Sequence, residues 1–265
     1  MNALRWVARA ARYLPAVAVF AAILLVWEAV VWLAGIAPYI LPAPHLVAWT
    51  LYSDRDTLLA SLWVTLSITF EALLAAGLGG FILALIFARW KWVAQAFLPI
   101  AVILQVTPII AIAPLLLIYL SSQAAVLACA FLVAFFPILS NTAVGLAAAD
   151  HNLVDLFRLY GASGWQSLFL LRLPAALPFF FAGLRIGGGL ALIGAIAAEI
   201  AAGSAGQGTG LAFRIVEAGY RLNIPRMFAA LTLISLSGIA IYLALTLLTH
   251  LVLRRWHDSA LDGQR

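Results

Sequence analysis

The sequence predicts an all-α membrane protein with six transmembrane helices, and three observations lead to this prediction. Of the 265 residues, 66% are hydrophobic and only 9% are charged, and the mean hydropathy is +1.10. A soluble domain carries about 25% charged residues, so this chain has too little charge to cover a water-facing surface. Apolar runs of bilayer length, about 20 residues each, fill the chain. We therefore expect one transmembrane domain over residues 1–265.

The apolar runs between breakers give the expected spans. Their bounds are Leu14–Gly35, Leu62–Ala88, Val93–Leu120, Ala124–Leu146, Leu177–Ala202 and Met227–Leu253. The first run exceeds the 7–15 apolar residues of a signal peptide, which favours a span over a cleaved leader. A polar, proline-bearing connection follows it over residues 38–60. Prolines interrupt the third run, which predicts a broken helix; they are Pro99, Pro108 and Pro114.

The distribution of basic residues predicts the orientation. Ten of the 15 lie on the side of the N-terminus, namely Arg5, Arg9, Arg12, Arg89, Lys91, Arg158, Arg172, Arg254, Arg255 and Arg265. Four lie on the other side, and Arg185 falls within a span. Because cytoplasmic loops carry the excess of arginine and lysine, we expect both termini in the cytoplasm. The net charge of +5 therefore indicates orientation in the lipid bilayer rather than a nucleic-acid partner.

No cofactor or metal site is predicted. The single cysteine, Cys129, excludes an internal disulfide. The histidines lack metal-ligand spacing; they are His45, His151, His250 and His257. The glycine-rich stretch 203–210 has no lysine and does not match a phosphate-binding loop, so any ATP must bind to a separate protein.

The connection at about 147–176, between the fourth and fifth spans, has its own pattern. An apolar stripe at helical spacing predicts a short helix; its members are Leu153, Leu156, Phe157 and Tyr160. Asp150 is the expected N-cap and Gly161 the expected stop. Periodicity alone leaves two interpretations open, a helix lying on the membrane surface or a helix presented to a cytoplasmic partner.

The same connection resembles the EAA loop of binding-protein-dependent ABC transporter permeases. The frame of that loop is an acid, two alanines, a glycine, nine residues and then Ile-x-Leu-Pro. Gly161, Leu173 and Pro174 match it and Asp155 supplies the acid, while Leu156 and Phe157 replace the two alanines and Leu171 replaces the isoleucine. Other segments resemble the nitrate/sulfonate/taurine-type branch, which includes thiamine-precursor and riboflavin-type permeases; they are 38–44, 105–108, 111–115, 135–138, 173–185 and 194–199.

This resemblance implies a MetI-like type I ABC importer permease fold with a cytoplasmic ATP-binding subunit and a periplasmic or lipoprotein solute-binding protein. It also implies a second permease copy, most simply a homodimer. The ATPase-coupling residues would be Asp155, Leu156, Phe157, Tyr160, Gly161, Leu173 and Pro174. The resemblance favours a thiamine-precursor pyrimidine or a riboflavin-like compound over sulfonates and nitrate as the substrate.

Candidate pathway residues lie where the chain would expose unpaired backbone groups or a charged side chain to lipid. A helix broken by proline is tolerated beside protein or a water-filled cavity. We expect the third, fourth and fifth spans to line such a cavity or its gate through Gln105, Thr107, Pro108, Asn141 and Glu199. A buried acid in a span needs a partner, and for Glu199 gating and packing stay open alternatives. Gly183 and Gly187 allow close helix approach, either within the chain or at a dimer seam.

Two alternative functions share some of these features. A secondary transporter or channel would need no ATPase, but it would be expected to show an inverted repeat, and none is evident. Gly161–Gly164 matches the Gly-x-Ser-Gly pattern of rhomboid intramembrane proteases, yet Ser163 lies in a loop rather than a span, where a base and an oxyanion hole are not expected. No catalytic residue is therefore predicted.

Overall fold

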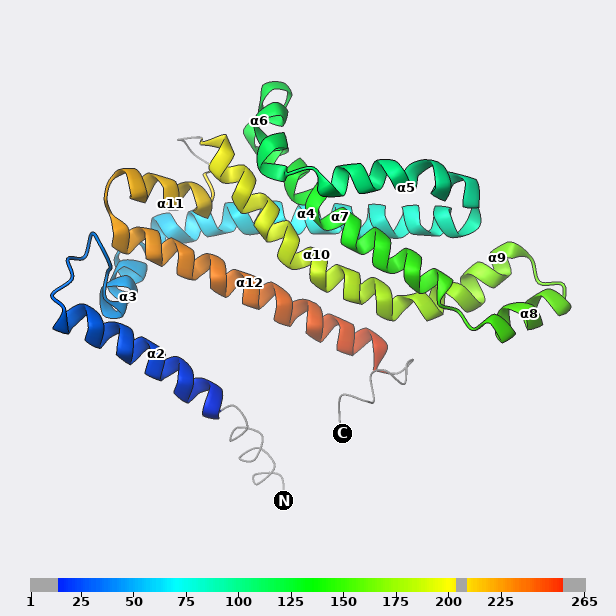
Figure 1. Ribbon diagram of the computed structural model, residues 1–265, viewed down its shortest axis with the longest axis horizontal. Helices are drawn as coiled ribbons and strands as arrows, with labels where there is room; N and C mark the ends of the chain where they lie inside the picture. Colours follow the sequence, from blue (N-terminus) through cyan, green and yellow to red (C-terminus); the bar gives the residue numbers. More distant parts are fainter. Residues whose placement is uncertain (1–13, 204–208, 255–265) are drawn as a thin grey trace, which may run out of the picture. The chain divides into compact units, whose positions relative to one another are not determined.

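The computed structural model describes residues 14–203 and 209–254, and within these ranges every regular element is a helix (Figure 1). The terminal basic residues used to predict the orientation lie outside the described residues, apart from Arg254; so does most of the glycine-rich stretch 203–210.

Within the described ranges, five helical segments are long and apolar enough to cross a bilayer. They are α2 (Leu14–Leu33), α4 (Arg55–Arg89), α7 (Ser122–Ala147), the segment Gly164–Ala202 and α12 (Ile224–Leu253). The pair α5 (Lys91–Val106) and α6 (Ile109–Tyr119), bent by 99°, makes the sixth span when counted together. The prediction of six transmembrane helices is confirmed.

The bend between α5 and α6 falls at one of the three prolines that were predicted to break this span. Pro108 is the N-cap of α6, and the residue before it, Thr107, has an extended backbone with φ −71° and ψ 125°. A proline removes an N–H and disfavours helical backbone in the preceding residue. Pro99 and Pro114 lie inside α5 and α6 without ending them. The predicted broken helix is therefore confirmed, with a single break.

The stretch 38–60 was expected to be a polar connection, and this expectation is partly wrong. It contains α3 (Pro44–Ser53) and the start of α4, separated by Asp54 alone. Proline is favoured in the first turn of a helix, where its missing N–H has no partner to lose, and Pro44 begins α3 in this way.

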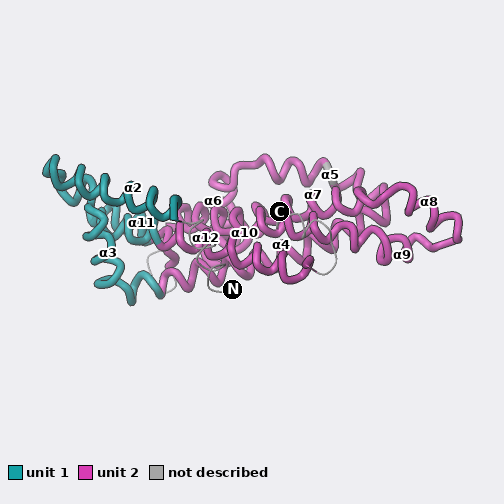
Figure 2. The backbone as a smooth tube through the Cα atoms, turned by 90° about the horizontal axis from the view of Figure 1, so that it is seen from below, with its two compact units in different colours: residues 1–59, 214–232 teal, residues 60–213, 233–265 magenta. Residues whose placement is uncertain are grey.

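The chain divides into two compact units (Figure 2). Unit 1 comprises residues 1–59 and 214–232. Three side-chain pairs tie its segments together: Trp27 with Phe228 at 5.8 Å between ring centroids, Glu28 with His45 at 2.6 Å, and Arg226 with Asp54 at 2.6 Å.

Unit 2 comprises residues 60–213 and 233–265, and its centre is the contact between α7 and α10 (Leu173–Ala202). A Cβ atom on Gly183 would lie 3.0 Å from the Pro137 carbonyl oxygen, and one on Gly187 would lie 2.9 Å from Ile138. These glycines therefore allow α10 to pack closely against α7 within the chain. Of the two alternatives left open by the sequence, this supports packing within the chain rather than a dimer seam.

The fifth span is longer than its predicted bounds of Leu177–Ala202. Helix α9 (Gly164–Ser167) leads through a π-helical turn, η1 (Leu168–Arg172), directly into α10. Within η1 the N–H of Leu173 bonds to the carbonyl of Leu168, five residues back. Pro174 cannot donate to the carbonyl four residues before it, and the wider turn accommodates this loss without ending the helix.

A pair of glycine variants tests the central contact. We expect Gly187→Ala to destabilise the protein by about 1–3 kcal/mol, because the new methyl group overpacks the contact with Ile138 and the carbonyl of Ala134. Gly189, two residues along α10, is exposed, and a Cβ atom added there would have no neighbour within 4 Å, so Gly189→Ala should leave the melting temperature in detergent unchanged or raise it. Equal melting temperatures for both variants would contradict this role of Gly187.

Candidate functional site

The connection between α7 and α10 forms the helix predicted there. Helix α8 (His151–Leu159) begins at Asp150, whose carboxylate accepts a 2.8 Å hydrogen bond from the Asn152 N–H. Its last residue is Leu159, and the stop signal is Gly161, which has φ +70°. The N–H of Gly161 bonds to the Arg158 carbonyl and that of Ala162 to the Phe157 carbonyl, which together form a Schellman motif. Both predicted end signals are confirmed.

The next turn is fixed by a second pair of caps. The Ser163 hydroxyl accepts a bond from the Gln166 N–H at 3.2 Å, and the Gln166 side chain accepts one from the Ser163 N–H at 2.7 Å. This capping box satisfies two N–H groups that the start of a helix leaves unpaired. The structure thus uses Ser163 as a helix cap.

The four apolar residues of the predicted stripe on α8 do not share one exposed face. Leu153, Leu156 and Tyr160 are exposed, as the stripe requires, but Phe157 is half-buried and turns inward beside Val154. Val154 and Phe157 therefore face the rest of unit 2, while Leu153, Leu156 and Tyr160 stay available for contact.

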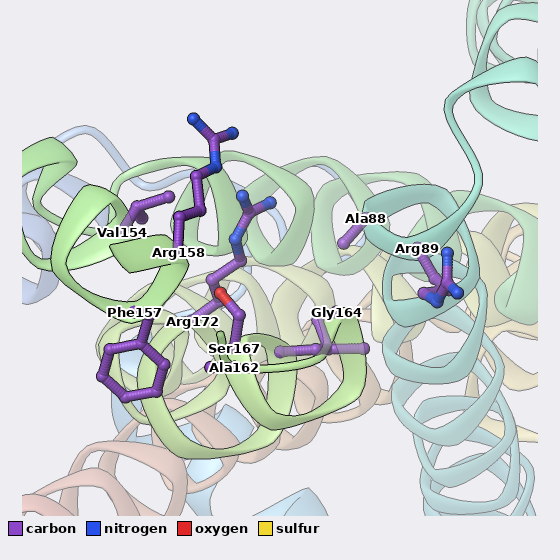
Figure 3. Close-up of a pocket in the computed structure, with 10 residues that line it drawn as sticks. Ala88, Arg89, Val154, Phe157, Arg158, Ala162, Gly164, Ser167 and Arg172 are labelled. Atoms are coloured by element: carbon purple, nitrogen blue, oxygen red, sulfur yellow. The ribbon is translucent and has the colours of Figure 1, made fainter. Parts of the chain in front are cut away.

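A cavity of about 300 Å³ lies beneath α8, between it, the end of α4 and η1 (Figure 3). Three arginines line it, Arg89, Arg158 and Arg172. Arg158 pairs with Asp155 at 3.1 Å, while Arg89 lies over the rings of Trp90 and Trp165 at 5.6 and 5.5 Å. The sequence marked these arginines only as indicators of orientation, because nothing in their spacing shows that they share one cavity.

Near the far end of α10, Glu199 is buried, with 6% of its surface exposed. One carboxylate oxygen accepts a bond from the Thr65 hydroxyl at 2.8 Å, and the other accepts one from the Ala212 N–H at 3.0 Å. The Thr65 oxygen in turn accepts a bond from the Leu211 N–H at 2.9 Å. Together the two side chains cap the start of α11 (Leu211–Tyr220), so a buried carboxyl group lies at a helix N-terminus.

Sequence reasoning identified Glu199 but missed Thr65, since a threonine in an apolar span carries no signal of its own. The close fit extends to Gly210, where any Cβ atom would collide with the Glu199 carboxylate.

The predicted pathway residues are partly brought together. Gln105 and Thr107 line a cavity of about 220 Å³ with Pro137 of α7 and Leu190 of α10. Gln105 also lines a neighbouring apolar cavity of about 360 Å³. Asn141 lines neither of these two cavities, because its side chain bonds to the Pro137 carbonyl at 2.8 Å and packs near Gly183. Its pathway role stays a prediction, as does that of Pro108, which makes the bend.

On α11 a carboxylate is held by arginines within unit 1. Glu217 accepts a 2.8 Å bond from Arg214 and pairs with Arg221 at 2.9 Å. The hydrogen bond from Arg214 lowers the pKa of Glu217 below its ordinary value, and the charges of the neighbouring arginines act in the same direction. The stability that these pairs contribute is therefore present above the ordinary carboxyl range and is lost as the pH falls through the lowered pKa.

The helical spans, the capped loop between two of them and the break in a third define a multi-pass membrane protein. The chain belongs to the family described as binding-protein-dependent transport system inner membrane component, whose family model matches residues 76–258, more than half of the chain. The family resemblance inferred from the sequence is confirmed.

Several relatives match over most of their length. A probable ABC transporter permease protein of Haemophilus influenzae is 32% identical, covering 90% of this chain and 96% of the relative. The riboflavin transport system permease protein RibX of Chloroflexus aurantiacus is 35% identical, with 89% and 88% covered. The formylaminopyrimidine transport permease protein ThiX of Halalkalibacterium halodurans is 31% identical, with 88% and 92% covered.

Proposed function

We propose that this chain forms the translocation pathway of a bacterial ABC importer and carries no enzymatic activity of its own. A separate ATPase subunit binds ATP, a solute-binding protein delivers the substrate, and a second copy of the chain completes the pathway. Family membership supports this proposal. The observation that carries the coupling role is the doubly capped loop, whose helix α8 leaves Leu153, Leu156 and Tyr160 exposed for a partner.

In this proposal the loop docks on the ATPase through α8. Asp155, Leu156, Phe157, Tyr160 and Gly161 form the docking helix and its stop. Leu173 and Pro174 begin α10, so motion of the docked helix reaches the span through η1. The whole chain then acts as one permease domain in the inner membrane.

Gly161 tests the coupling role, because its positive φ is unfavourable for other residues. A residue with a Cβ atom in the left-handed region costs about 1–2 kcal/mol, and a β-branched one is the worst case. We expect Gly161→Val to insert normally, to bind the ATPase subunit more weakly and to abolish uptake. The readouts are co-purification of the two subunits and uptake into cells or vesicles.

Gly161→Asn is the matched control, because asparagine tolerates the left-handed region and a Cβ atom here has nothing within 4 Å. It should keep most of the uptake. Normal transport by the valine variant would show that this loop does not couple the ATPase to the pathway.

The proposed orientation has both termini and the α8 loop in the cytoplasm, and the excess of basic residues on that side supports it. Single cysteines test it in intact cells with a membrane-impermeant thiol reagent. We expect Ser53→Cys, at the end of α3, to react, and Ser163→Cys, in the α8–α9 turn, to stay unlabelled until the membrane is opened. The native Cys129 is fully buried and should give little background. Labelling of Ser163→Cys from outside would reverse the orientation.

For the substrate we propose a neutral or weakly charged heteroaromatic compound, of the pyrimidine or flavin kind. No charged side chain lines the two cavities at the α5–α6 break, whereas Phe87 and Phe136 offer aromatic surface and Gln105 a hydrogen-bonding amide. Nitrate, taurine and sulfonates would need a compensating cation. Competition for uptake by a pyrimidine, riboflavin, nitrate and taurine distinguishes these classes, and inhibition by the anions alone would contradict the proposal.

We further propose that Glu199 holds the gate at its end of α10. Its carboxylate joins α4, α10 and the first residues of α11, so the helices can part only when the Thr65 and Ala212 bonds break. In this proposal the gating and packing roles of Glu199 are the same interaction, because the packed contact has to open during transport.

Thr65→Val and Glu199→Gln test this device. Thr65→Val keeps the shape but leaves the Leu211 N–H without its acceptor, which we expect to cost about 1–3 kcal/mol. Glu199→Gln keeps hydrogen-bonding capacity and removes the charge. Both variants should raise the ATPase rate of the assembled transporter in the absence of binding protein.

Thr69→Val is the matched control, one turn along α4. Among the described residues its hydroxyl bonds only to the Thr65 backbone carbonyl, so its removal leaves no buried donor there unpaired, and ATPase regulation should stay native. Native ATPase regulation in Thr65→Val and Glu199→Gln, together with lowered stability, would reduce Glu199 to a structural role.

A further inference from the structure

The cavity beneath α8 carries a surplus of positive charge. Arg89, Arg158 and Arg172 line one space of about 300 Å³, and none of its lining residues is acidic. The only carboxylate paired with any of the three, among the described residues, is that of Asp155, and most of its side chain is exposed outside the cavity. Three like charges around one small space repel each other unless an anion lies between them.

Arg89 has aromatic partners and Arg158 a carboxylate partner, whereas within the described residues Arg172 has neither. Arg89 lies against the faces of Trp90 and Trp165, whose rings are nearly perpendicular at 85°, so its position is set by aromatic contacts that leave the N–H edges unoccupied. Gly164 leaves room for it: a Cβ atom there would lie 3.8 Å from the guanidinium. Figure 3 shows Arg158 and Arg172 extending to the same side of the loop.

An arginine at the end of a helix can simply face the negative end of the helix dipole. That explanation suits Arg89 at the end of α4 and Arg158 in the last turn of α8. It does not suit Arg172, because η1 continues directly into α10 and has no free carbonyl end. Arg172 is half-buried, and within the described part of the chain it has no carboxylate within 4 Å.

The residues around the cavity are of the kind expected at the depth of lipid headgroups. The apolar span of α4 ends at Arg89, and Trp92 and Trp165 beside it are exposed, as tryptophans at a membrane interface commonly are. Basic pockets between transmembrane helices at this level bind anionic headgroups, and the planar guanidinium matches two phosphate oxygens at once.

We propose that the phosphodiester of an anionic phospholipid, of the phosphatidylglycerol kind, occupies this cavity. It bonds to the guanidinium groups of Arg158 and Arg172, neutralises the surplus charge and braces α8 against the end of α4. The inward face of α8, with Val154, Phe157 and Arg158, thus takes the lipid, and the outward face with Leu153, Leu156 and Tyr160 stays available for protein. Lipid binding here does not depend on the transported substrate.

Lipid titration of the full-length protein in detergent, followed by native mass spectrometry, tests the proposal. Dioleoylphosphatidylglycerol should bind more tightly than dioleoylphosphatidylcholine. Arg158→Gln/Arg172→Gln should weaken the tightest phosphatidylglycerol site about fivefold per arginine, roughly 25-fold in all. Arg89 is left in place because its packing on two tryptophans would confound the result.

Arg55→Gln/Arg221→Gln removes the same number of exposed arginines from unit 1 and should keep the native affinity. Arg158→Lys/Arg172→Lys keeps the charge without the planar fork and should fall between the native protein and the glutamine variant. Thermal unfolding shows that each variant is folded.

Equal phosphatidylglycerol affinity in the native protein and the folded glutamine variant would overturn the proposal. Displacement of the lipid by an equal concentration of inorganic phosphate would assign the cavity to a free anion instead. Loss of the lipid on assembly with the ATPase subunit, with cross-links from position 172 to acidic residues of that subunit, would assign it to the partner protein.

Discussion

The backbone-to-backbone contact between α7 and α10 is the interaction on which the other helices of unit 2 depend. In lipid the hydrophobic effect does not drive helices together, so close packing and small residues must do so. Gly183, Gly187 and Gly194 let α10 approach the α7 backbone to within van der Waals contact. Among the described residues, three buried clusters then attach α4 to this pair. They include Ile68 and Ala72, Leu73 and Ala76, and Ala84 and Phe87 of α4.

The same pair of helices connects the two candidate functional ends of the molecule. Helix α10 has 30 residues, a length of about 45 Å, with Pro174 near its start and Glu199 near its end. Because α10 is packed against α7 over this length, a displacement of the α8 loop reaches the Glu199 contact through one continuous element. The cavity lined by Gln105 and Thr107 lies beside these two helices, at Pro137 and Leu190.

The parts of the structure that the sequence predicted are those set by local or one-dimensional signals. Hydropathy was enough for the spans, Pro108 for the bend, and Asp150 and Gly161 for the ends of α8. The signals that failed depend on partners distant in the chain. Glu199 is recognisable as a costly acid, but Thr65 lies 134 residues away, and only the fold brings the two together. The inward turn of Phe157 and the shared cavity of the arginines likewise follow from packing of the loop on α4, which periodicity within α8 does not contain.

The π-helical turn at Leu168–Arg172 has a geometrical consequence for the loop. A π-turn accommodates one more residue than an α-helical turn, and each residue of an α-helix advances about 100° around the axis. The extra residue before Pro174 therefore rotates everything that precedes it around the axis of the span. It sets the direction in which Trp165 and α8 point away from the span. A relative of this chain that lost one residue here would present the same loop sequence to a different side of the helix axis.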